Sequence, residues 1–83
     1  MQVITANRLT DGLVVYLDAG GRWTTDIAAA RLLDADDAVA AALAEGQAAA
    51  GRQEIVDPYA VAVVAGAKGV APQSLRERIR AFG

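Results

Sequence analysis

The 83-residue chain contains no cysteine and no histidine. Without cysteine there are no disulfides, thiolate metal sites or thiol nucleophiles. Without histidine there is no Ser-His-Asp or Cys-His catalysis, no ordinary zinc or haem ligation and no histidine proton shuttle. Acid–base chemistry would fall to carboxylates, Tyr16, Tyr59 or Lys68, and the sequence shows no convergent pair among them. We therefore expect a protein that is not an enzyme and holds no cofactor or metal.

Long apolar runs and large side chains are also scarce. No stretch approaches the roughly 18–20 consecutive apolar residues of a membrane span, and the opening Met-Gln-Val-Ile-Thr lacks the order of a signal peptide. We expect a cytoplasmic protein without a membrane partner. Hydrophobic residues make up 54% of the chain, but 20 residues are alanine. One small domain, residues 1–83, with thin stability follows, and a protein partner or homodimerisation would add to it.

Two β-type runs, residues 2–9 and 13–18, flank an Asp11-Gly12 pair, which is typical of a β-hairpin. With a two-residue turn, Asn7 would lie opposite Tyr16 and Arg8 opposite Val15. Alternation along the strand then places Asn7 and Arg8 on opposite faces of the hairpin. We thus predict an N-terminal hairpin of this register.

The segment 24–33, TTDIAAARLL, fits either a helix or a third strand, and we favour a short strand near 29–33. Asp34 is then expected to cap a helix with acidic residues in its first turn. That helix should end by Gly51, weakened in its middle by Gly46 at about 1 kcal/mol relative to alanine. The acidic run 34–37 is interpreted as helix capping, since it lacks the glycine and glutamate of a calcium loop.

Residues 54–66, EIVDPYAVAVVAG, form the longest β-type run. Pro58 lacks an N–H and holds Asp57 extended, whereas Tyr59, Val61 and Val63 alternate onto one face. The element order predicts an α+β fold with a small, mainly antiparallel sheet: a hairpin, a third strand, a helix, a long strand and a C-terminal helix.

The C-terminal helix is predicted over 75–82, because Ser74 and Glu77 have the spacing of a capping box. Residues 71–83 carry three basic and one acidic side chain, while the rest of the chain is acidic. Arg76 and Arg80 lie together on one flank of this helix. They either solvate a packed helix or form a fork for a carboxylate, phosphate or sulfur oxyanion, which Arg8 could join. So few basic residues disfavour nucleic acid as a partner.

Two aromatic residues are candidates for an interface. Trp23 is either a partly buried packing residue or an interface hot spot, a role in which tryptophan and arginine are enriched. Tyr59 follows Asp57-Pro58 and either shapes a backbone corner or contacts a partner.

The ordered segments TANRLTDGLVVYL, GRW, VDPYAVAV and LRERIRAFG resemble a small bacterial family known as domain of unknown function 2849. The resemblance covers almost all of the chain. It implies a cytoplasmic accessory role in sulfite reduction, because genes of this family tend to lie beside those of sulfite or nitrite reductases. It supplies no catalytic residues.

Our leading hypothesis is a non-enzymatic protein-interaction module that docks on a sulfite reductase haemoprotein or its electron donor. The alternative is a sensor that binds sulfite, sulfate or a nucleotide at the C-terminal arginine helix. The candidate contact residues for either role are Arg8, Trp23, Tyr59, Arg76 and Arg80.

Overall fold

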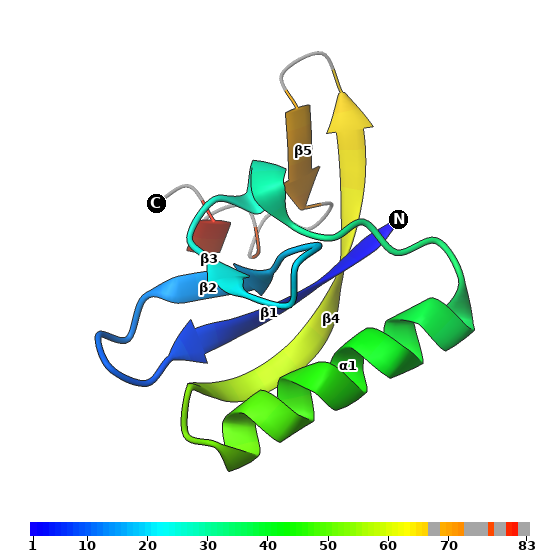
Figure 1. The fold of residues 1–83 in the computed structure, drawn as a ribbon. Helices are drawn as coiled ribbons and strands as arrows, with labels where there is room; N and C mark the ends of the chain where they lie inside the picture. The colour runs from blue at the N-terminus through cyan, green and yellow to red at the C-terminus, as the bar shows by residue number, and fades with distance from the viewer. Residues whose placement is uncertain (67–68, 73–76, 78–79, 82–83) are drawn as a thin grey trace.

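A computed structural model describes residues 1–66, 69–72, 77 and 80–81, which form a five-stranded sheet crossed by one long helix (Figure 1). The strands lie in the order β3-β2-β1-β4-β5, and each neighbouring pair is antiparallel. This confirms the predicted α+β fold. The elements are β1 (Gln2–Arg8), β2 (Val14–Leu17), β3 (Trp23–Thr24), the 3₁₀ turn η1 (Ile27–Ala29), α1 (Asp36–Gly51), β4 (Ile55–Gly66) and β5 (Gly69–Pro72).

The predicted hairpin is present as β1 and β2, but its two-residue turn is wrong. The Arg8 N–H donates to the Leu13 carbonyl at 2.8 Å, which closes a longer loop in which Gly12 has a φ of 73°. Thr5 therefore pairs with Tyr16, two residues away from the predicted partner. Because a shift of two residues keeps every side chain on its face, Asn7 and Arg8 still lie on opposite faces.

The third strand lies at Trp23–Thr24, so the strand predicted near 29–33 is wrong. The reason is a tight turn: the Asp18 carboxylate accepts the N–H groups of Gly20 and Arg22, at 2.9 and 2.8 Å. This turn brings Trp23 directly opposite Leu17. The residues that follow form η1, and only isolated bridges, at Ala30 and Leu33, attach the predicted segment to the sheet.

Helix α1 ends at Gly51 as predicted, but its N-cap is Ala35 and not Asp34. The acidic first turn, Asp36 and Asp37, begins the helix one residue later than the sequence suggests. Gly46 faces the sheet, where an added Cβ would lie 3.0 Å from Pro58 Cβ. A glycine that weakens the helix locally therefore permits the close approach of α1 to β4.

Strand β4 contains a bulge where it pairs with β1. Thr5 pairs with Tyr59 and Asn7 with Val56, so one extra residue of β4 lies between the two pairs. Asp57 has a φ of 54°, in the left-handed region, and the predicted extended conformation before Pro58 is wrong. The extra residue sets Tyr59 beside Thr5, on the same face as Val61.

The last strand, β5, pairs with the end of β4 and was not predicted from the sequence. The predicted helix 75–82 lies largely outside the described residues. Glu77, Arg80 and Ala81 are described, and all three are helical.

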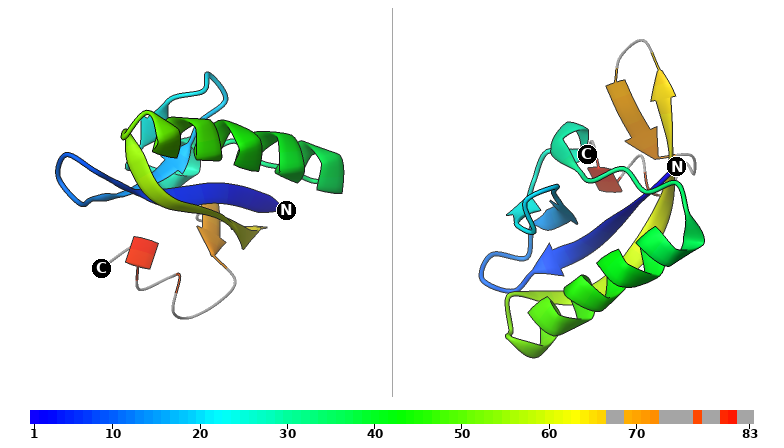
Figure 2. Two further views of the ribbon diagram at one scale, coloured as in Figure 1. Left: turned by 90° about the horizontal axis from the view of Figure 1, so that it is seen from below. Right: turned by 45° about the vertical axis from the view of Figure 1, so that its right-hand side comes forward.

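The two faces of the sheet are covered differently (Figure 2). On one face, α1 buries Ile4, Leu17 and Ile55 with its alanines. The opposite face packs Val3, Tyr16 and Val61 against η1 and Ala81. Figure 2 shows α1 and the C-terminal residues on opposite sides of the sheet. No helix within the described part of the chain is long and apolar enough to cross a membrane.

Candidate functional site

The predicted contact residues fall into two groups on opposite faces of the sheet. Arg8 and Trp23 line one cleft on the side of α1. Tyr59 and Arg80 contact each other on the other side. Arg76 lies outside the described residues. The structure therefore does not bring Arg8 and Arg80 into one anion site, because they extend from the two faces of the sheet.

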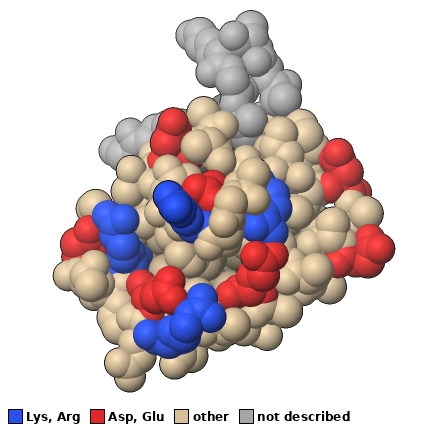
Figure 3. Space-filling view, viewed as in Figure 1, with Lys and Arg blue, Asp and Glu red and all other residues tan. Residues whose placement is uncertain are grey.

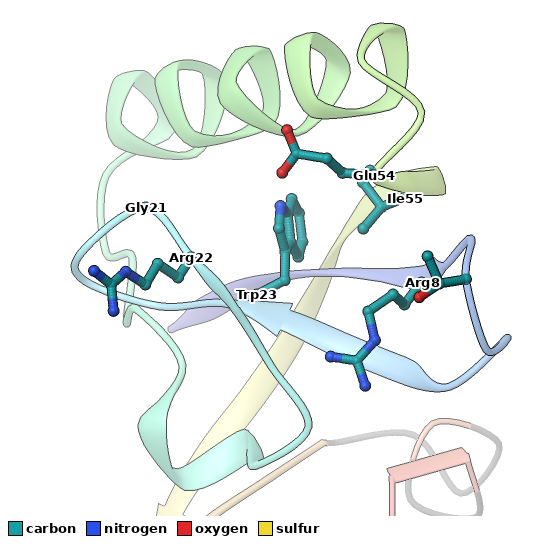
Figure 4. Close-up of a pocket in the computed structure, with 7 residues that line it drawn as sticks. Arg8, Gly21, Arg22, Trp23, Glu54 and Ile55 are labelled. Carbon is teal, nitrogen blue, oxygen red and sulfur yellow. The ribbon is translucent and has the colours of Figure 1, made fainter.

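The Trp23 cleft is an open cavity of about 360 Å³. It lies between the C-terminal end of α1, the β1–β2 loop and the turn that precedes β3 (Figure 4). In Figure 4 the indole ring stands upright between Arg22 on one side and Arg8 on the other, with Glu54 at its edge near α1. Its lining residues are Arg8, Thr10, Gly21, Arg22, Trp23, Glu54 and Ile55.

Local backbone chemistry fixes the position of the indole. The Asp18 turn returns the chain through Gly21, whose φ of 82° suits glycine, and Trp23 then pairs with Leu17. The Trp23 side chain packs against the buried cluster that contains Ile55 and Ala49. The side chain is half-buried, so it is anchored by the core while it forms a wall of the cleft.

The charged groups at the Trp23 cleft differ in how far they are neutralised. Arg8 binds Asp11 through two nitrogens, at 3.1 and 2.8 Å, and this guanidinium lowers the pKa of the Asp11 carboxyl. Glu54 pairs with Arg52 at 2.5 Å. Arg22 is exposed and forms no ion pair with any other described residue. Arg22 is thus the cleft cation with the most binding capacity left.

On the opposite face, a polar cluster attaches the C-terminal residues to the sheet. Arg80 donates to Thr5 Oγ1 at 2.7 Å and to Asn7 Oδ1 at 2.8 Å. Its guanidinium also lies 5.3 Å from the centre of the Tyr59 ring, within cation–π range. We call this set the Arg80 cluster; its members are Thr5, Asn7, Tyr16, Tyr59, Glu77 and Arg80.

Glu77 completes the Arg80 cluster. The Tyr59 hydroxyl donates to the Glu77 carboxylate at 3.1 Å, and Arg80 Nη1 lies 3.6 Å from Glu77 Oε1. The Glu77 and Arg80 side chains are only 15% and 18% exposed. Nearby, burial raises the pKa of Tyr16, and the positive charge of Arg80 partly offsets that rise. These contacts use Arg80 inside the protein, so the arginine behaves as an attachment point for its segment.

Several charged side chains on the surface form ion pairs with a neighbour of opposite charge. On the face drawn in Figure 3, arginines lie beside carboxylates and do not gather into an area of one sign. Two such pairs are Arg31 with Glu45 at 2.6 Å and Arg8 with Asp11 at 2.8 Å. Within the described ranges, no three metal-ligating side chains come together.

The two other charged residues of the Trp23 cleft, Arg22 and Glu54, were not among the predicted contact residues. Arg22 directly precedes Trp23 in the sequence GRW, so its neighbour could have indicated it. Glu54 lies 31 positions further along the chain, and only the pairing of β4 with β1 brings it to the indole. Nothing in the local sequence marks it.

The chain belongs to a family of small proteins without an assigned activity. The family described as "Protein of unknown function (DUF2849)" matches residues 2–83, which is nearly the whole chain. This confirms the resemblance drawn from the ordered sequence segments. No curated protein and no solved structure matches the chain significantly.

Proposed function

We propose that this protein is a non-enzymatic interaction module that binds an acidic protein partner through the Trp23 cleft and the loop beside it. The observation that carries the proposal is a half-buried tryptophan in an open cleft between two arginines. Tryptophan and arginine dominate the energy of many protein interfaces. An anchored indole loses little side-chain freedom on binding, so it suits such a role.

The surroundings of the cleft add apolar area. Leu9 and Leu13, in the β1–β2 loop next to Arg8, are 50% and 49% exposed. They lie outside the cleft lining and add exposed apolar area to the loop that follows Arg8. Apolar area next to charged side chains is the usual combination of an interface core and its polar rim. Complementary charge would accelerate the encounter with an acidic partner and orient it.

The expected partner is a sulfite reductase haemoprotein or its electron donor. This identity rests on the family resemblance, which implies a role near sulfite and nitrite reduction. The cytoplasm is the compartment in which such a partner would be met. Arg8, Arg22 and Trp23 support a contact that combines charge with an aromatic side chain. The identity of the partner is the subject of the experiment below.

The test is binding of the tagged protein to purified sulfite reductase haemoprotein and, separately, to its electron donor. We expect binding to one of them that weakens as salt rises toward about 0.5 M, where exposed charges are screened. The Arg8→Ala/Arg22→Ala variant should bind less. The control is Arg80→Gln, measured at a temperature where it is folded, since Arg80 lies on the opposite face of the sheet and contacts Tyr59 there. Equal binding by both variants would contradict the proposal.

The alternative, anion sensing at the C-terminal arginine helix, has less support. Arg80 already donates to Thr5 and Asn7 and lies over the Tyr59 ring. An anion there would have to replace two short hydrogen bonds. Calorimetry with sulfite and sulfate at millimolar concentration tests this alternative, and heat that disappears in Arg80→Gln would favour it.

A further inference from the structure

The β1–β2 loop contains a pair of residues at which the main chain can change covalently. Asp11 is the one aspartate of the sequence that is followed by glycine. The Gly12 nitrogen can attack Cγ of Asp11 and close a small ring, because glycine has no side chain to obstruct the approach. Both residues are exposed, and a Cβ built at Gly12 would have no neighbour within 4 Å. The loop therefore has room for the ring.

This reaction needs no reagent other than water. The Gly12 nitrogen loses its proton and bonds to Asp11 Cγ, while the C–O bond of the carboxyl group breaks and a water molecule leaves. Water then attacks either carbonyl carbon of the cyclic imide. Opening at the original main-chain carbonyl leaves the chain running through Cβ and Cγ, which is isoaspartate. Opening at the other carbonyl restores aspartate.

Contacts of Arg8 oppose the first step. The Gly12 N–H donates to the Arg8 carbonyl at 2.7 Å, so the nucleophile must leave this hydrogen bond before it attacks. The Arg8 guanidinium binds both oxygens of Asp11, at 3.1 and 2.8 Å, and lowers the pKa of that carboxyl group. A neighbouring cation favours the ionised carboxylate, whereas oxygen leaves as water most readily from the protonated form. Arg8 thus holds both reacting groups.

We propose that Asp11-Gly12 is a site of isoaspartate formation and that Arg8 controls its rate. In the folded protein the reaction waits for the loop to release the Gly12 hydrogen bond and the Asp11 carboxylate. The product carries its free carboxylate on Cα and adds one carbon to the main chain, so the contact with Arg8 is lost. The proposal concerns the chemistry of this chain alone and does not depend on the proposed partner.

The test is incubation of the full chain at neutral pH, followed by peptide mapping with mass spectrometry that distinguishes isoaspartate from aspartate. Enzymatic methylation of isoaspartate gives a second readout. We expect the product at Asp11 and not at the other aspartates, and we expect it to accumulate several-fold faster in urea than in the folded protein. Equal accumulation at all aspartates, or no product at Asp11 in the unfolded chain, would overturn the proposal.

Variants separate the role of Arg8 from general stability. Arg8→Gln should accelerate the reaction several-fold in the folded protein and leave its rate in urea close to that of the wild type. The matched control is Arg31→Gln, which removes a guanidinium from a different ion pair, with Glu45 at 2.6 Å. It should react at the wild-type rate. If folded Arg8→Gln reacts no faster than Arg31→Gln, Arg8 does not control the reaction and the proposal is wrong.

Discussion

The two faces of the sheet are stabilised by different means. On the α1 face, small residues let a helix approach closely, and an added Cβ at Gly46 would lie only 3.0 Å from Pro58 Cβ. On the other face, the C-terminal residues are attached by polar contacts of Arg80 with Thr5 and Asn7. Close packing tolerates little change in volume, whereas a polar attachment depends on charge and hydrogen bonding. The contact of α1 with β4 at Gly46 is therefore sensitive to side-chain size. The attachment of Arg80, beside the apolar cluster on its face, is sensitive to charge and hydrogen bonding.

The largest effect should come from filling the space on the α1 face. Gly46→Val would place a branched side chain where a Cβ is already 3.0 Å from Pro58, and we expect a loss of about 2–3 kcal/mol of unfolding free energy. Urea denaturation measures it. Gln47→Val, on the exposed side of the same helical turn, is the control and should change stability by less than about 0.5 kcal/mol. Helix propensity alone would favour valine over glycine, so a loss in Gly46→Val no larger than that in Gln47→Val would contradict close packing as the cause.

A smaller effect is expected from the polar face. Arg80→Ala removes two hydrogen bonds from a charged donor and leaves Thr5 and Asn7 without that partner, so we expect a loss of about 2 kcal/mol. Arg80→Lys should recover only part of it, because one ammonium does not replace a fork that reaches two residues. A stability equal to that of the wild type would show that the Arg80 cluster does not hold the C-terminal residues.

Tyr16, on the same face as Arg80, should also make the free energy of unfolding fall at alkaline pH. Burial raises the pKa of Tyr16 above its ordinary value of 10.0 in the folded state. The folded protein then keeps the proton that the unfolded chain releases, so this contribution is intact below about pH 10 and is lost as pH rises through the raised pKa. Tyr16→Phe should flatten the fall in stability over that range. If stability falls with pH as steeply in Tyr16→Phe as in the wild type, the alkaline effect does not come from Tyr16.

The smallest effect concerns the β1–β2 loop. The Arg8 guanidinium lowers the pKa of Asp11 below its ordinary value of 3.8. Its contribution is present above that value and is lost as pH falls through the lowered pKa. Because the pair is exposed, we expect only a slight change in acid stability in Asp11→Asn. Titration of the Asp11 carboxyl followed by NMR measures its pKa. A value above 3.8 would contradict the stabilising effect of Arg8 on the carboxylate.

Much of the fold follows from local sequence. The β-type runs place β1, β2 and β4, and the end of α1 lies at Gly51 as predicted. The third strand was misplaced because the Asp18 turn, formed by side-chain hydrogen bonds, returns the chain earlier than strand propensity suggests. The bulge at Asp57 was missed for a similar reason, since pairing with β1 overrides the preference of a residue before proline.

The candidate site was predicted less completely than the fold. Arg8 and Trp23 were identified by residue type, but their cleft depends on tertiary pairing that also brings in Glu54. Arg80 was identified as a contact residue by its place on an arginine-rich helix. Its bonds to Thr5 and Asn7, 75 and 73 positions away, cannot be read from local spacing.

The most direct test compares Arg80→Ala with Arg8→Ala/Arg22→Ala in two assays, thermal unfolding and partner binding at a temperature where all proteins are folded. We predict that Arg80→Ala lowers the melting temperature and retains binding, whereas the double variant keeps its melting temperature close to that of the wild type and loses binding. The reverse result, with binding lost in Arg80→Ala and retained in the double variant, would contradict the assignment of the Trp23 cleft as the contact surface.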